Sequence, residues 1–191
     1  NALLSDAGTP LISDPGYKLV RDARAAGRTI VTIPGPSAVI AAITLSGLPS
    51  DRFLFMGFLP NKTKARTDAL TEVAGLRATL AFYESGPRCA ASLADMAAVL
   101  GDRPAALCRE ISKAYEETLT GTLTELSAAC AAMAPKGEIV LIVGPPGEKP
   151  PAEESDLEAA LVEALGRLSA SQGASEEAPT VRVGCKALYG P

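Results

Sequence analysis

Residues 5–16 of the chain read Ser5-Asp6-Ala7-Gly8-Thr9-Pro10-Leu11-Ile12-Ser13-Asp14-Pro15-Gly16. The apolar run Ala2–Ser5 at the start of this stretch predicts a buried strand. A helix is predicted behind it, because Asp14 can serve as N-cap, Pro15 suits the first helical position and Gly27 can end the helix. The stretch is therefore expected to be the loop that leads from a strand into a helix.

A second strand, loop and helix follow directly. The β-branched run Thr29–Ile33 predicts the strand, Pro34-Gly35-Pro36 interrupts it, and Ser37 can cap an apolar helix over Ala38–Leu45. Strand, helix, strand and helix at these lengths are typical of a βαβ unit with a parallel sheet. Loops that follow neighbouring parallel strands converge on one crevice, so we expect the two loops to form a ligand site. The alternative is that each loop is only a tight turn, since the glycine spacing is neither that of the Rossmann motif nor that of the P-loop.

A linker at residues 47–51 precedes a second series of strands and helices. Strands are expected at Phe53–Phe58, Ala78–Tyr83, Ala105–Arg109, Tyr115–Leu119 and Glu138–Val143. Helices are expected near Lys62–Ala74, Cys89–Leu100 and Leu123–Met133. These elements predict a second α/β domain with a mixed sheet.

We therefore predict an α/β fold of two domains followed by a tail. Residues 1–48 are expected to be the C-terminal remainder of an N-terminal α/β domain, and residues 49–146 a second α/β domain. Residues 147–191 are expected to be a linker, an amphipathic helix at 156–168 and an irregular tail. Asn1 is not a methionine and stands directly before an apolar strand. We therefore expect the first domain, with its parallel sheet, to be incomplete at its N-terminus.

The composition excludes several classes of function. With 22 acidic and 18 basic residues the net charge is −4, whereas dedicated nucleic-acid binders are usually basic, so any RNA contact must be local or lie outside this chain. No histidine is present, which excludes Ser-His-Asp and Cys-His catalysis. The four cysteines are widely spaced, so we expect no metal site and interpret them as thiols in a reducing cytoplasm. No apolar run reaches the roughly 18 residues of a membrane span, and no signal peptide is visible.

Several further motifs stand in a fixed order along the chain. Together with residues 5–16 they are Ile33-Pro34-Gly35-Pro36-Ser37-Ala38, Gly47-Leu48-Pro49-Ser50-Asp51-Arg52-Phe53, Gly57-Phe58-Leu59-Pro60, Phe82-Tyr83-Glu84-Ser85, Arg109-Glu110 with Lys113, and Lys136-Gly137-Glu138. In this order and spacing they resemble the cytidine-2'-O-methyltransferase branch of the tetrapyrrole methylase superfamily. The resemblance covers about residues 2–144. It is faint at 186–189 and absent at 169–185, so nothing is carried over to the tail.

The resemblance implies a methyltransferase, usually a homodimer, with S-adenosylmethionine (S-adenosyl-L-methionine) folded into the cleft between two α/β domains. It also implies that the first strand and the glycine-rich loop of the family precede Asn1. Cofactor contacts, largely through the backbone, are implied for Gly8, Thr9, Pro10, Ile12, Pro34, Gly35, Pro36 and Ser37. Tyr83 and Glu84 would face the cleft from the second domain.

The implied reaction is methylation of a ribose 2'-hydroxyl in ribosomal RNA of the small subunit. Methyl transfer from a sulfonium is an in-line displacement that gains from alignment, and a base or a cation would help this weak nucleophile. Without histidine the candidates are Glu84, Glu110 and Lys113, and we favour Lys113 with Glu110. The alternative is that Glu110 forms only a surface ion pair with Arg109, and that Lys113 is a solvated loop charge.

RNA contact is predicted for Lys62, Lys64 and Arg66, which stand next to Phe58-Leu59-Pro60. Cations beside an apolar platform would suit single-stranded RNA, although a charged, solvated helix face is an equal alternative. Two rival functions remain open. One is methylation of a porphyrin or corrin carbon, and the other is a non-catalytic fragment that binds RNA or a subunit.

Overall fold

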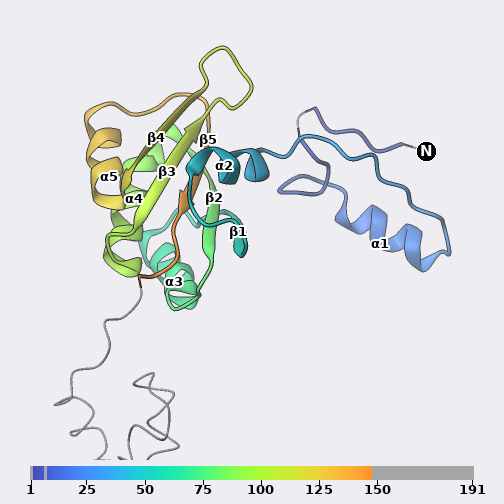
Figure 1. Ribbon diagram of the computed structural model, residues 1–191. Coiled ribbons are helices and arrows are strands. Elements are labelled where there is room, and N and C mark those ends of the chain that lie inside the picture. The colour runs from blue at the N-terminus through green and yellow to red at the C-terminus, as the bar shows by residue number, and fades with distance from the viewer. Residues whose placement is uncertain (1, 7, 148–191) are drawn as a thin grey trace, which may run out of the picture. The chain divides into compact units, whose positions relative to one another are not determined.

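The computed structural model describes residues 2–6 and 8–147 (Figure 1). The described residues up to Pro146 belong to one compact unit. The helix predicted at 156–168 and the predicted tail lie outside the described residues.

A five-stranded mixed sheet forms the centre of this unit (Figure 1). Its strands are β1 (Phe53–Phe58), β2 (Thr79–Ser85), β3 (Pro104–Arg109), β4 (Glu117–Thr122) and β5 (Glu138–Val143). They lie in the order β1-β2-β5-β3-β4, in which β1 and β2 are parallel and all other neighbours are antiparallel. The mixed sheet predicted for residues 49–146 is confirmed.

The strand pairing places one end of each of the five strands at the same end of the sheet. Residues that pair there are Phe58 with Tyr83, Ser85 with Glu138, and Arg109 with Glu117. We call this the Phe58 end. The carboxyl ends of β1, β2 and β3 meet there, which is where open α/β sheets place their ligands.

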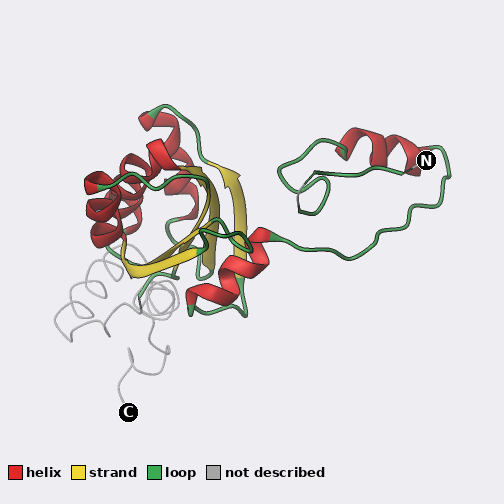
Figure 2. Ribbon diagram, turned by 90° about the horizontal axis from the view of Figure 1, so that it is seen from above, coloured by secondary structure: helices red, strands yellow, loops and turns green. Residues whose placement is uncertain are grey.

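Helices cover both faces of the sheet (Figure 2). The helices of one face are α3 (Thr63–Val73), α4 (Gly86–Leu100) and α5 (Leu123–Ala132). They bury leucines and Met96 against the large side chains Phe82 and Leu141. On the other face α2 (Ala38–Ser46) packs on smaller side chains of the strands, among them Ala81 and Ala106. Because successive residues of a strand point to opposite faces, each strand serves both layers.

The strands and helices predicted for residues 49–146 are confirmed, with boundaries that differ by a few residues. The largest difference is at β4, which was expected at Tyr115–Leu119 and lies at Glu117–Thr122. The antiparallel register with β3 places Glu117 opposite Arg109, so pairing with a distant strand rather than local propensity fixes where β4 starts.

Two predicted strands in the first 48 residues are wrong. Ala2–Ser5 and Thr29–Ile33 form no strand, and the described part of residues 1–48 contains no parallel sheet. The side chains of Val31 and Ile33 are 82% and 88% exposed. A β-branched run becomes a strand only when its backbone pairs with a neighbour, and no described strand pairs with either segment.

The first helix, α1 (Tyr17–Ala25), starts later than predicted. Its N-cap is Gly16, so the prediction of Asp14 as N-cap and Pro15 as first helical residue is wrong. Gly16 has a φ of 131°, which favours glycine and sets the chain at the start of the helix. The predicted end at Gly27 is confirmed, because Gly27 has a left-handed φ of 68° and the amides after the helix bond back to its last carbonyls.

Candidate functional site

The two loops predicted to hold a cofactor lie together. The hydroxyl of Thr9 donates a hydrogen bond of 3.0 Å to the carbonyl of Pro36, which joins residues 8–13 to residues 34–37. Gly8 and Gly35 both have open space where a side chain would stand, with no atom within 4 Å. Ser37 is the N-cap of α2, but its side chain makes no capping hydrogen bond. The joined loops therefore present accessible backbone and the Ser37 hydroxyl.

The first loop is strained and reaches the end of β1. Leu11 and Ser13 have φ values of 74° and 56°, a region that residues other than glycine rarely adopt. The hydroxyl of Ser13 lies 3.3 Å from the position that a Cβ would take at Gly57. Gly57 also has a positive φ of 67°, next to an irregularity in the pairing of β1 with β2. The loop of residues 8–13 thus contacts the Phe58 end of the sheet.

Tyr83 lies on the α2 face of the sheet within an aromatic cluster. Its ring centroid is 4.8 Å from that of Phe55 and 5.5 Å from that of Phe58. Burial raises the pKa of Tyr83, and the carboxylate of Glu138 adds to the effect. The phenol is therefore neutral at physiological pH and lies near the first residue of β5.

Glu84 points to the other face and is buried. Its carboxylate accepts hydrogen bonds from the Ser85 amide at 2.8 Å and the Ser92 hydroxyl at 2.6 Å, and pairs with Arg88 at 3.3 Å. The expectation that Tyr83 and Glu84 face the same cleft is wrong, because successive strand residues point to opposite faces. Glu84 instead joins β2 to the start of α4.

Glu110, Lys113 and Glu138 form a charged cluster at the Phe58 end. The Lys113 ammonium lies 3.1 Å from the Glu110 carboxylate and 3.0 Å from that of Glu138. Glu110 also accepts a hydrogen bond of 2.8 Å from the Glu138 amide. A side chain at Gly137 would overlap the Glu110 carboxylate, so glycine at this position leaves room for the cluster.

The charge state of this cluster follows from its hydrogen bonds. The Glu138 amide, and then Lys113, lower the pKa of Glu110. The carboxylates of Glu138 and Glu110 raise the pKa of Lys113. Lys113 is therefore an ammonium at neutral pH and is better suited to stabilise an anion than to accept a proton.

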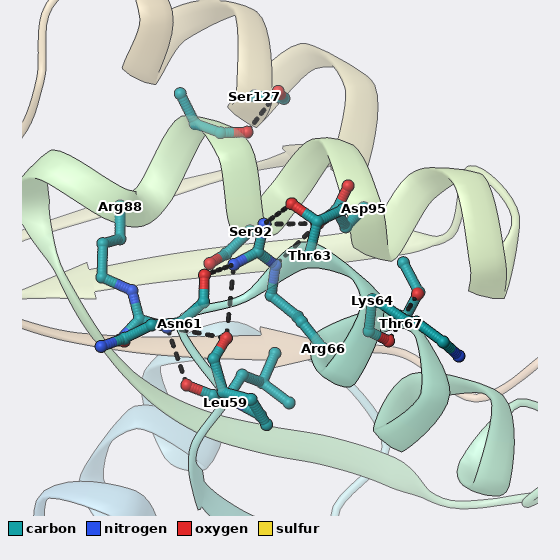
Figure 3. A network of polar contacts seen from close by, with 12 residues as sticks. Leu59, Asn61, Thr63, Lys64, Arg66, Thr67, Arg88, Ser92, Asp95 and Ser127 are labelled. Atoms are coloured by element: carbon teal, nitrogen blue, oxygen red, sulfur yellow. Dashed lines mark hydrogen bonds and ion pairs between the residues drawn. The ribbon is translucent and has the colours of Figure 1, made fainter.

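The three predicted RNA contacts have different environments, and Figure 3 labels two of them, Arg66 and Lys64. Arg66 is 5% exposed and its guanidinium forms an ion pair with Asp95. Lys62 and Lys64 are exposed, and Lys64 pairs with Asp68 at 3.0 Å. The side chain of Arg66 is thus occupied inside the protein, whereas the two lysines are open to solvent.

Comparison with known proteins decides the family. The sequence pattern of the Tetrapyrrole (Corrin/Porphyrin) Methylases matches residues 1–127. The chain belongs to the tetrapyrrole methylase family. Two solved methylase structures have the same fold. They are the methyltransferase CobJ (TM-score 0.56, 19% identity, covering 75% of this chain and 64% of that one) and cobalt precorrin-4 methyltransferase (0.55, 16%, 72% and 61%).

Curated relatives of this methylase are much more similar in sequence. Ribosomal RNA small subunit methyltransferase I of Mesorhizobium japonicum is 50% identical over 98% of the chain, which spans 64% of that relative. The protein of the same name from Xylella fastidiosa is 48% identical over 99% of the chain, which spans 70% of it. The predicted family and its ribosomal RNA branch are thereby confirmed.

Sequence reasoning did not assign roles to several residues of this methylase that the structure brings into the site. Glu138 completes the charged cluster, Arg88 holds the Leu59 carbonyl next to Phe58, and Asp95 holds Arg66. Glu138 belongs to the motif Lys136-Gly137-Glu138, so the sequence contained a signal for its role in the site. Asp95 gave none, because its partner Arg66 lies 29 residues away along the chain, and the contact of Arg88 with the Leu59 carbonyl spans the same separation.

The cysteines of the methylase are structural in the part that the structure describes. Cys89, Cys108 and Cys130 are buried free thiols, and burial raises the pKa of Cys89 to about 12. Across residues 2–6 and 8–147 no group of three or more acidic or thiol side chains is arranged to hold a metal ion. No described helix is both long and apolar enough to span a bilayer.

Proposed function

We propose that the protein is an S-adenosylmethionine-dependent methyltransferase that methylates the 2'-hydroxyl of a cytidine ribose in 16S ribosomal RNA of the small subunit. The observation that carries this proposal is the identity of about half of all residues with relatives named ribosomal RNA small subunit methyltransferase I. CobJ and cobalt precorrin-4 methyltransferase are 19% and 16% identical to the chain, which supports a common fold and not a common substrate.

The two joined loops fit the proposed cofactor. Gly8, Thr9, Pro10 and Ile12 and the loop of residues 34–37 would hold S-adenosylmethionine through their backbone, since Gly8 and Gly35 leave open space. Tyr83 would contact the cofactor from the second domain. We propose that this domain begins at residue 49. When bound, the cofactor supplies an electrophilic methyl group.

The charged cluster would act on the ribose. In-line transfer needs the 2'-oxygen to be aligned, because its new bond to the methyl carbon would form as the bond between that carbon and sulfur breaks. The proton of the 2'-hydroxyl would pass to solvent water. The Lys113 ammonium would stabilise the negative charge left on this oxygen as the proton departs, or the charge of a flanking phosphate. Glu110 would position Lys113, which it contacts at 3.1 Å, and Glu84 would support α4 from within the core.

The remaining proposals concern partners. Lys62 and Lys64 would contact the RNA backbone, with Arg66 acting inside the protein. We also propose that the enzyme is a cytoplasmic homodimer, as the family resemblance implies.

Two measurements test the proposed function. Titration calorimetry with S-adenosylmethionine is carried out on this chain and on a form lengthened to the span of its Mesorhizobium relative. Binding by either form supports the proposal, whereas no binding by both refutes it. Transfer of a tritiated methyl group to small subunits lacking the modification should label a cytidine ribose. An active enzyme that leaves these subunits unlabelled would reject RNA as the substrate.

The role of Lys113 needs its own comparison. Lys113→Gln should lower kcat for methyl transfer about 100-fold, because one electrostatic contact to a developing charge is lost. Lys18→Gln, a change of an exposed lysine on α1, should leave kcat unchanged. An equal kcat for Lys113→Gln and the unaltered chain would exclude Lys113 from catalysis.

A further inference from the structure

Three consecutive carbonyls after β1 are held by two arginines (Figure 3). Arg88 donates a hydrogen bond to the Leu59 carbonyl at 2.7 Å, and Arg66 donates to the Asn61 carbonyl at 3.1 Å. Both arginines reach the Pro60 carbonyl between them, at 3.5 Å and 3.3 Å. The arginines come from different helices, so this short loop is fixed to α3 and α4 at the same time.

Each arginine is itself fixed by a carboxylate. Arg66 pairs with Asp95 of α4, and Arg88 pairs with the buried Glu84 of β2. Buried ion pairs stabilise a fold little after desolvation, but they impose one geometry on their neighbours. The four side chains therefore form a rigid frame for residues 59–61.

This frame presents an exposed aromatic ring. Leu59 is buried, whereas Phe58, the residue before it, is 58% exposed. One side of the Phe58 ring is supported by Tyr83 at 5.5 Å, and Tyr83 is supported in turn by Phe55. Phe58 also adjoins Gly57, where the proposed cofactor loop makes contact through Ser13.

The charges around the ring indicate what it binds. Lys62 and Lys64 are exposed within six residues of Phe58, and in the described part of the chain Lys62 pairs with no carboxylate. Single-stranded nucleic acid is bound by aromatic rings that stack on bases and by cations that follow the phosphates. An exposed ring with exposed lysines close to it along the chain matches this chemistry.

We propose that Phe58 stacks on an unpaired base of the RNA, and that Arg66 and Arg88 are positioning residues that hold Phe58 in place. This inference rests on the proposed function, because it names the base contact of that substrate. Placed next to the contact between Ser13 and Gly57, the stacked base would bring its nucleotide to the proposed methyl-donor site.

The test is binding of an unstructured oligoribonucleotide, measured by fluorescence anisotropy. Phe58→Leu keeps the apolar volume but removes the π face, and should weaken binding about 5- to 100-fold. Phe58→Tyr keeps the ring and should bind as the unaltered chain does. Phe53→Leu is the matched control, because Phe53 is 42% exposed on the same strand at its other end. Equal binding by Phe58→Leu and the unaltered chain would overturn the proposal.

A second measurement, of base fluorescence, uses the unaltered chain and requires no variant. A 2-aminopurine base placed in the oligoribonucleotide should lose fluorescence when it stacks on the bound protein, and a full scan of positions without quenching would overturn the proposal.

The positioning role of Arg88 has its own test. Arg88→Gln should weaken RNA binding several-fold while calorimetric binding of S-adenosylmethionine stays unchanged. Arg88→Lys should restore part of the RNA affinity. Loss of cofactor binding in Arg88→Gln would indicate a general structural role and contradict the positioning role.

The two proposals fail in different ways. Labelled subunits together with unaffected RNA binding by Phe58→Leu would leave the proposed function standing and reject the role of Phe58. Unlabelled subunits would reject the proposed function, whereas failure of the unaltered chain to bind the oligoribonucleotide would reject the role of Phe58.

Discussion

Gly137 shows how a single residue can set the geometry of the charged cluster. Its φ of 95° lies in the region that favours glycine, and a Cβ there would overlap the Glu110 carboxylate. Glu110 is itself left-handed, with a φ of 49°, and accepts the amide of Glu138 beside Gly137. The cluster is therefore defined by backbone conformation as much as by charge, which is typical of strained functional sites.

We expect Gly137→Ala to lower the free energy of unfolding by about 1–3 kcal/mol, from the strained φ and the displaced carboxylate. Urea denaturation measures the change. Gly75→Ala is the control, because no atom lies within 4 Å of its Cβ position, and it should shift stability by less than about 0.5 kcal/mol. Equal stability of the two variants would show that the Glu110 side chain can adopt another position without loss of stability.

The same cluster predicts a dependence on pH. The pKa of Glu110 is lowered below its usual 4.5, so its contribution to stability is present above that value and is lost as pH falls through the lowered pKa. The pKa of Lys113 is raised above 10.5, so its contribution is lost only as pH rises through the raised pKa. The unaltered chain should exceed Glu110→Gln in stability at neutral pH, and the difference should shrink below pH 4.5. A difference that stays constant down to pH 3 would contradict the lowered pKa.

Among the helices that the structure describes, α5 has the most complete start signal. Thr122 accepts a hydrogen bond of 3.3 Å from the Glu125 amide, and the Glu125 carboxylate accepts one of 2.8 Å from the Thr122 amide. This reciprocal capping box satisfies two amides that the helix leaves unpaired. Because Thr122 is also the last residue of β4, it makes the strand end and the helix begin at one residue.

Thr122→Ala should therefore lower the free energy of unfolding by about 1 kcal/mol, within the range of about 0.5–2 known for such caps. Thermal and urea unfolding measure the loss. Thr122→Ser retains the hydroxyl and should remain close to the unaltered chain. A loss of similar size in both variants would attribute the effect to packing of the threonine methyl group instead of the cap.

The elements differ in how far the sequence predicted them. β5 could be predicted because residues 139–143 form a continuous apolar run after a turn, and this run is buried on both faces. Thr29–Ile33 has equally strong β propensity but no described partner strand, and pairing is a property of the whole fold.

In the site, Glu84 and Arg66 were recognised as charged residues near the right loops. Their burial could not be inferred, because it depends on Ser92 and Asp95 of α4, which are distant along the chain.

On the scale of the molecule, the proposed site is assembled at one end of the sheet. Strand pairing brings Phe58, Tyr83 and Glu138 there, and the contact of Ser13 with Gly57 adds the loop of residues 8–13. Segments from residue 8 to residue 138 thus take part in one region, although the net charge of the whole chain is −4. An acidic protein can bind RNA locally, where exposed cations such as Lys62 and Lys64 follow a stacking residue along the chain.

This arrangement predicts a weak dependence of RNA binding on salt. Single-stranded RNA releases counterions so that log K falls with log salt by about 0.7 for each phosphate neutralised. With Lys62 and Lys64 as the phosphate contacts, the slope should be about −1.4. The double variant Lys62→Gln with Lys64→Gln should bring the slope close to zero, whereas Lys18→Gln should leave it unchanged. Anisotropy titrations at several potassium chloride concentrations give the slopes. A slope steeper than about −3 would require phosphate contacts at other cations and would place the main RNA surface away from Phe58.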